Sequence, residues 1–184
     1  MKFIELSRFL ERIEKTTLRN EIMGILAELF AKSLNEEIGQ IVYLSLGRLR
    51  PKFDRMEFNL AEKMMIRAVA RMAKVSNEEV TKTYKEVGDL GEVVKGLRVL
   101  ESRNKGSELS VIEVYEKLLE IAKEEGQGSQ ERKVSKLSKL LSDLDELSAK
   151  YVTKIVMGKL RLGFSDKTIL DALSYMENGD KSGR

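Results

Sequence analysis

Two junctions in this chain combine glycine, hydroxyl and cationic residues in a spacing that suits phosphate binding. The first covers residues 126–133, around the expected start of a helix. A helix start exposes several unpaired backbone amides and the positive end of the helix dipole, and both attract a phosphate group. Glycine lets the backbone approach such a ligand closely, and cations neutralise its charge. The candidate contacts in this junction are Gly128, Ser129, Arg132 and Lys133.

The second junction, residues 158–165, has a similar composition and ends at the expected N-cap of the next helix. Lys159 and Arg161 are separated by one residue, so both can project from a non-helical loop. Glycine plus serine at a single helix boundary is ordinary turn chemistry. Two such junctions in a stretch with a local excess of Lys and Arg favour a polyanionic ligand. The candidate contacts here are Gly158, Lys159, Arg161, Gly163 and Ser165.

Further cations gather at two other places. Thr17 and Arg19 lie at the entrance to the second expected helix, and the loop around Pro51 is also basic, with Arg48, Arg50, Lys52 and Arg55. Hydroxyl and guanidinium groups of this kind suit a nucleic-acid backbone whose sequence is not read. The chain has 6 Phe and 5 Tyr, and because many of these lie on apolar helix faces, little remains for stacking on bases. We therefore expect a duplex rather than a single strand as the ligand.

The composition excludes several kinds of chemistry. Among the 184 residues there is no cysteine and no histidine, which rules out a disulfide framework, a thiolate nucleophile, a cysteine zinc site and a Ser-His-Asp triad. No Walker phosphate loop is present, and carboxylate pairs such as Asp143 with Asp145 are typical of exposed helix ends. No apolar run approaches the ~20 residues that span a bilayer. We expect a soluble, intracellular protein.

Apolar residues recur with a helical period along nearly the whole chain, and no alternating stretch predicts a strand. We therefore expect an all-α fold, a compact multi-helix domain of roughly ten short helices. Its clearest helices are predicted at residues 3–13, 18–34, 60–75, 111–125, 130–141, 143–157 and 166–176. Helix starts are predicted where a polar cap precedes a glutamate by three residues, at Asn59, Ser76 and Ser110. Gly88 and Gly126 are predicted to end helices.

Seven segments, in order along nearly the whole chain, resemble the N-terminal helical DNA-binding domain of ATP-dependent DNA ligases, particularly the archaeal type. They are Glu14–Thr17 with Arg19, Tyr43–Leu49, Ala61–Lys63, Gly88–Gly91, Val114–Leu118, Gly128–Ser129 with Arg132–Lys133, and Gly158–Gly163. The resemblance implies a domain of the DNA-ligase DNA-binding-domain type that grips the minor groove of nicked double-stranded DNA through sugar and phosphate contacts. It also implies that Thr17–Arg19 and the two glycine-containing junctions face the DNA.

The resemblance further implies a parent enzyme that joins DNA in replication, repair and recombination, with ATP and Mg²⁺ as cofactors. Such ligases form phosphodiester bonds with a nucleotidyltransferase domain, which carries a Lys-x-Asp-Gly lysine, and an OB-fold domain. No Lys-x-Asp-Gly occurs here, so we expect residues 1–184 to be one DNA-binding domain, truncated at its C-terminus, with no catalytic residue, cofactor site or metal site. Expected partners are nicked DNA, the missing ligase domains or a sliding clamp, and no membrane, at a cytoplasmic, nucleoid-associated location.

The main alternative is a helical protein-interaction module, or a stand-alone ligase remnant without DNA-joining activity. Such a module would expose an apolar patch, and its binding would depend little on salt. A phosphate-binding domain would instead lose affinity steeply as salt rises. The two interpretations therefore differ in a measurable property.

Overall fold

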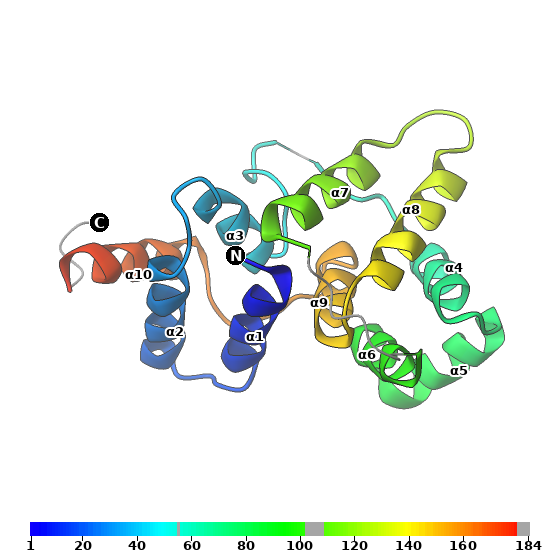
Figure 1. The fold of residues 1–184 in the computed structure, drawn as a ribbon, viewed down its shortest axis with the longest axis horizontal. Coiled ribbons are helices and arrows are strands. Elements are labelled where there is room, and N and C mark those ends of the chain that lie inside the picture. The colour runs from blue at the N-terminus through cyan, green and yellow to red at the C-terminus, as the bar shows by residue number, and fades with distance from the viewer. Residues whose placement is uncertain (55, 102–108, 180–184) are drawn as a thin grey trace.

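Every regular element in residues 1–54, 56–101 and 109–179, the part of the chain that the computed structural model describes, is a helix (Figure 1). The all-α prediction is confirmed. The helices are α1 (Phe3–Glu14), α2 (Arg19–Ala31), α3 (Ile38–Ser45), α4 (Glu62–Ala73), α5 (Asn77–Val87), α6 (Leu90–Glu101), α7 (Val111–Lys123), α8 (Ser129–Asp143), α9 (Glu146–Val156) and α10 (Asp166–Asn178). None of these helices has the length and apolar character needed to cross a membrane.

Local capping chemistry sets several helix ends where the sequence predicts them. Ser110 and Glu113 form the reciprocal capping box at the start of α7. Ser76 caps α5 by accepting a hydrogen bond from the Glu79 amide at 3.1 Å. At the other end of α5, Gly88 adopts a left-handed conformation with φ of 78°, which glycine reaches without steric cost.

Two predicted boundaries are wrong. α4 begins at Glu62 with Ala61 as its N-cap, and Asn59 instead lies in the preceding loop with φ of 48°. α7 ends at Lys123, so Gly126, with φ of 78°, shapes the loop that follows rather than ending the helix. Asn and Gly both tolerate left-handed backbone, and this property serves a loop turn as well as it serves a helix end.

The helices form two groups joined by α7 and α9. Figure 1 shows α1, α2, α3 and α10 on one side and α4, α5, α6 and α8 on the other. α9 contacts α1 in the first group and α6 in the second, while α7 contacts α3 and α8. The interior between them is apolar, and Tyr151 of α9 is its largest fully buried side chain.

Two connections cross between the groups and touch each other. One is the loop of residues 46–61 between α3 and α4, and the other is the segment of residues 157–165 between α9 and α10. A Cβ atom added at Gly47 would lie 3.4 Å from the Cβ atom of Leu160. The fold therefore places the basic loop around Pro51 beside the second glycine-containing junction.

Candidate nucleic-acid interface

The α9–α10 connection presents its cations to solvent because its residues alternate in burial. Leu162 is buried and Leu160 is half-buried, whereas Lys159 and Arg161 are exposed. Gly158, with φ of 63°, turns the chain out of α9, and the Lys159 amide donates to the Lys154 carbonyl at 2.8 Å. The apolar residues thus anchor the segment, and the two cations project on its outer side.

Lys159 is held by α4 and α5. Its Nζ atom donates to the Tyr84 hydroxyl at 2.6 Å, lies 5.4 Å from the centre of the Tyr84 ring and is 3.6 Å from Glu62 Oε2. The hydrogen bond with Tyr84, together with the charge of Glu62, raises the pKa of Lys159 above its ordinary value. The ammonium group therefore stays charged and has a fixed position at the edge of α4.

Arg161 differs from Lys159 in that it forms no ion pair or hydrogen bond with the described residues. It precedes the start of α10, where Ser165 is the N-cap and its side chain caps no amide. The first residue of α10, Asp166, is paired with Arg48 and with Lys52, whose Nζ lies 2.8 Å from Oδ2. The hydrogen bond from Lys52 and the pairing with Arg48 lower the pKa of Asp166. The loop that leads into a helix start without a side-chain cap therefore carries an unpaired guanidinium group.

The α7–α8 junction is shaped by two left-handed glycines, Gly126 and Gly128. Gly128, rather than Ser129, is the N-cap of α8, and Ser129 is its first residue. Arg132 is turned back onto this loop: Nε donates to Glu124 at 2.6 Å, and the two Nη atoms donate to the carbonyls of Gln127 and Glu125, both at 2.8 Å. In this arrangement the Arg132 guanidinium organises the loop.

Lys133 is buried, which contradicts its expected place among exposed cations. Its side chain runs into the interior, and Nζ donates to the Phe58 carbonyl at 2.7 Å. The reason is the helical register, because Lys133 lies one turn before Leu137 on the apolar face that packs α8 against α4. We therefore remove Lys133 from the set of candidate phosphate contacts.

Replacing Lys133 with methionine tests this correction. We expect Lys133→Met to lower the free energy of unfolding by about 1 to 2 kcal/mol, because the Phe58 carbonyl loses its buried donor. Urea denaturation followed by circular dichroism measures this loss. At a temperature where the variant is folded, the salt dependence of its DNA binding should match that of the wild type. A shallower salt dependence would show that Lys133 contacts phosphate after all.

Two cations on α4 that are not among the residues predicted from the sequence converge on the start of α8. Arg67 and Arg71 each place an Nη2 atom 2.5 Å from a different oxygen of Glu131. Arg67 lines an open surface hollow with Gly126 and Gly128. Arg71 and Arg67 line a second hollow, at the end of α4 and the start of α5. The signal was present in the sequence, since residues four apart lie on the same face of a helix.

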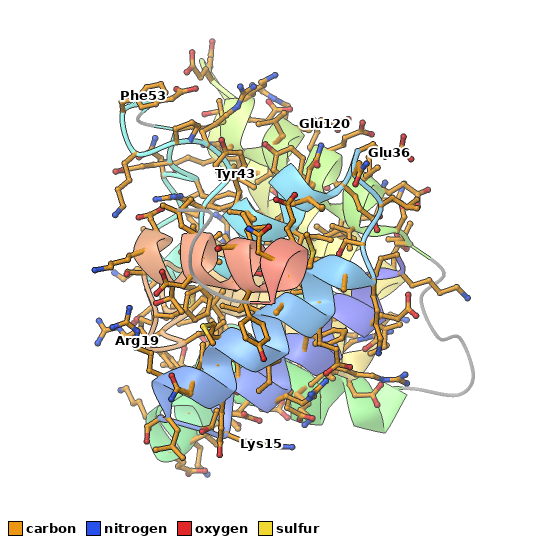
Figure 2. All side chains as sticks on the ribbon, turned by 90° about the vertical axis from the view of Figure 1, so that its left-hand side faces the viewer. Lys15, Arg19, Glu36, Tyr43, Phe53 and Glu120 are labelled. Atoms are coloured by element: carbon orange, nitrogen blue, oxygen red, sulfur yellow. The ribbon has the colours of Figure 1, made fainter. Side chains whose placement is uncertain are left out.

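The start of α2 contacts α10, the helix that follows the α9–α10 connection. Arg19, at the start of α2, places Nη2 3.1 Å from Oδ2 of Asp171, while Thr17 is exposed. Figure 2 shows Arg19 and Phe53 toward one side of the view, opposite Glu36. The first residue of α2 therefore lies toward the same side as Phe53 of the basic loop around Pro51.

These contacts link the predicted loops into one set of neighbouring cations, which we call the basic band. α10 joins Arg19 to the Pro51 loop, and α4 joins Lys159 to the start of α8. Arg55 lies outside the described residues. The basic band consists of Arg19, Arg48, Lys52, Arg67, Arg71, Lys159 and Arg161.

Two further lysines in the stretch rich in positive charge are internal. Lys150 and Lys154 are buried on α9, and their Nζ atoms lie 2.7 and 2.5 Å from the carboxylate of Glu14 at the end of α1. Burial opposes ionisation of Glu14, but hydrogen bonds from both lysines and from the Tyr151 hydroxyl outweigh it and lower its pKa to about 2. This network fixes α1 on α9, and thereby places the turn that carries Thr17.

The fold and the basic band define an all-α domain with exposed cations at several helix starts. The profile of the family described as "DNA ligase N terminus" matches residues 2–174, and the chain belongs to this family. The resemblance found in the sequence is therefore confirmed.

Full-length relatives show the same relationship. The chain is 46% identical over 184 residues to a "Probable DNA ligase" of Dictyoglomus thermophilum, and 43% identical over 185 residues to one of Aquifex aeolicus. It is 41% identical over 189 residues to a "DNA ligase" of Pyrobaculum calidifontis. Each alignment covers 100% of this chain and 31 or 32% of the relative. The chain thus spans about a third of the length of these relatives.

Proposed function

We propose that this domain binds the sugar-phosphate backbone of nicked duplex DNA, without reading its sequence, as the N-terminal part of an ATP-dependent DNA ligase. The observation that carries the proposal is the position of Arg161. Its exposed guanidinium group has no partner among the described residues, and it belongs to the loop that leads into α10, four residues before the N-cap Ser165, whose side chain caps no amide. Family membership supports DNA as the ligand.

Guanidinium groups and helix starts both bind phosphate. Guanidinium can bind a phosphate through two hydrogen bonds at once, and a helix start adds backbone amides and the positive end of the dipole. Lys159, two residues before Arg161, and Arg19, which pairs with Asp171 of α10, add further positive charge. None of these contacts reads a base edge, so the binding energy comes from the backbone and from released counterions.

In this proposal the joining chemistry belongs to other ligase domains. The chain lacks the Lys-x-Asp-Gly lysine that accepts AMP, so ATP and Mg²⁺ act outside it, and its own residues hold the duplex while the joining domains work. The proposal extends to replication, repair and recombination, to a nucleoid-associated location in the cytoplasm, and to a sliding clamp as a further partner.

Replacing Arg161 with alanine tests the phosphate contact. We expect Arg161→Ala to weaken binding by about five- to tenfold at about 0.1 M salt, because one phosphate contact and its counterion release are lost. The loss should be equal for unrelated sequences, and the slope of log affinity against log salt should become shallower by about one unit. Fluorescence anisotropy with labelled duplexes over a salt series measures both quantities.

The matched control is Arg8→Ala, an exposed arginine of α1 outside the basic band. It removes the same charge, and it should change neither the affinity nor the slope by a comparable amount. A loss confined to one base sequence, or equal losses in the two variants, would contradict a specific backbone contact at Arg161. Weak, salt-independent association with proteins instead of DNA would favour the interaction module.

A further inference from the structure

Phe53 is the most exposed large apolar side chain among the described residues. Its exposed fraction is 88%, whereas the next highest value, for Leu18, is 60%. The ring therefore contributes nothing to the interior of the domain. Because the ring is apolar, the free energy falls when a partner covers it and removes it from water.

The loop that carries Phe53 is held at both of its ends. Leu49 and Phe58 are buried, and their carbonyls accept hydrogen bonds from the Tyr115 hydroxyl at 2.6 Å and from Lys133 Nζ at 2.7 Å. Between them, the Asp54 amide donates to the Pro51 carbonyl at 3.0 Å and closes a turn with Phe53 at its tip. The ring is thus presented from an anchored turn, which lowers the entropic cost of using it in a contact.

The residue that precedes Phe53, Lys52, belongs to the basic band. Lys52 and Arg48 both pair with Asp166 at the start of α10, and Gly47 packs against Leu160. Figure 2 shows Phe53 on the side that also carries Arg19. The partner that covers the ring must therefore tolerate adjacent cations, which favours an anionic ligand with apolar surface close to its charges.

We propose that Phe53 packs its ring against the sugar and base edges of the DNA duplex that the basic band holds. This inference rests on the proposed function and adds an apolar contact to it. In duplex DNA the sugars and base edges lie directly beside the phosphates, and apolar side chains make such contacts in DNA complexes. A phosphate held beside Lys52, the residue that precedes Phe53, would bring these groups to the tip of the turn.

The first test uses tryptophan emission, because the chain contains no tryptophan of its own. Phe53→Trp should show a change in emission on titration with nicked duplex, which follows the binding curve measured by anisotropy. The control is Leu34→Trp, at a side chain 58% exposed and two residues from Glu36, which Figure 2 shows on the opposite side. Its emission should stay constant over the same titration.

The second test separates the ring from the charges. Phe53→Ala should weaken duplex binding by about tenfold, the loss expected for a partly covered ring, and it should leave the salt slope unchanged. Arg161→Ala, by contrast, flattens that slope.

The outcomes separate this inference from the proposed function. Salt-dependent binding with no change in the emission of the Phe53→Trp variant, and full affinity in Phe53→Ala, would overturn the contact and leave the DNA-binding function in place. Emission that shifts with protein concentration alone would assign the ring to a protein contact and overturn the proposal. If the wild type binds no duplex at low salt, the proposed function fails, and this inference fails with it.

Discussion

Replacing Gly91 with alanine is expected to lower the free energy of unfolding by about 2 kcal/mol. Gly91 lies where α6 packs against α9, and a Cβ atom added there would lie 3.0 Å from the Lys150 carbonyl oxygen and 3.0 Å from Cγ of Lys154. The carbonyl belongs to the backbone of α9, so the helices must move apart to admit a methyl group. Urea denaturation followed by circular dichroism measures the loss.

Gly96→Ala, on the same helix, is the matched control. A Cβ atom at Gly96 would meet nothing within 4 Å, so alanine should stabilise the domain by roughly 0.5 to 1 kcal/mol through its higher helix propensity. Opposite signs for the two glycines are the expected result. Equal effects would show that α6 does not depend on close approach to α9 at Gly91.

The second large effect is expected for Glu14→Gln, which should cost about 2 kcal/mol. Lys150 and Lys154 are both buried, and they would lose the carboxylate that accepts hydrogen bonds from both. They keep Glu92 and Asp89 as partners, and the Glu14 side chain is 28% exposed, so the cost falls below that of a fully buried pair. Equilibrium unfolding at pH 7 measures it.

The stability lost in Glu14→Gln should depend on pH. Folding lowers the pKa of Glu14 from 4.5 to about 2, so its contribution to stability is present above pH 4.5 and is lost as the pH falls toward 2. The difference in stability between wild type and Glu14→Gln should therefore shrink over that window. A difference that stays constant from pH 7 to pH 3 would contradict the role given to the carboxylate.

Glu28→Gln controls for surface charge. The pKa of Glu28 is also lowered to about 2 by hydrogen bonds from Arg12 and Lys32, but this cluster is exposed to solvent. We expect its replacement to change stability by less than about 0.5 kcal/mol, as is usual for surface ion pairs. A loss of stability as large as that of Glu14→Gln would show that the burial of Lys150 and Lys154 does not explain the effect of Glu14→Gln.

The helical class and many boundaries could be predicted because they depend on local signals. The capping box at Ser110 and the left-handed Gly88 act within one helical turn, so the sequence contains all that is needed. Asn59 and Gly126 were misassigned since a left-handed residue can shape a loop as well as end a helix. Each residue type in the segment Gly88–Gly91 has a structural reason. Gly88 ends α5, and Asp89 Oδ1 accepts a hydrogen bond from the Gly91 amide at 2.8 Å. Gly91 has no side chain, which lets α9 pack closely against α6.

The sequence predicts only in part which cationic side chains are exposed to solvent and which are buried or paired. The alternation of leucine with cation in residues 159–162 indicates which side chains face solvent, and the structure has Arg161 exposed and Leu162 buried. Whether a lysine is free depends on partners far away in the chain, such as Phe58 for Lys133 and Glu14 for Lys150. Local charge counting cannot find such pairs. The convergence of Arg67 and Arg71 on Glu131 likewise arises from the packing of α4 against α8.

The basic band is tested most directly by the binding of this domain to nicked, intact and single-stranded DNA of two unrelated sequences, measured by fluorescence anisotropy over a salt series. We expect duplex binding that is equal for the two sequences, stronger than binding to single strands, and steeply weakened by salt. Sequence-dependent binding, or a duplex affinity that does not change with salt, would contradict a backbone contact made by the basic band.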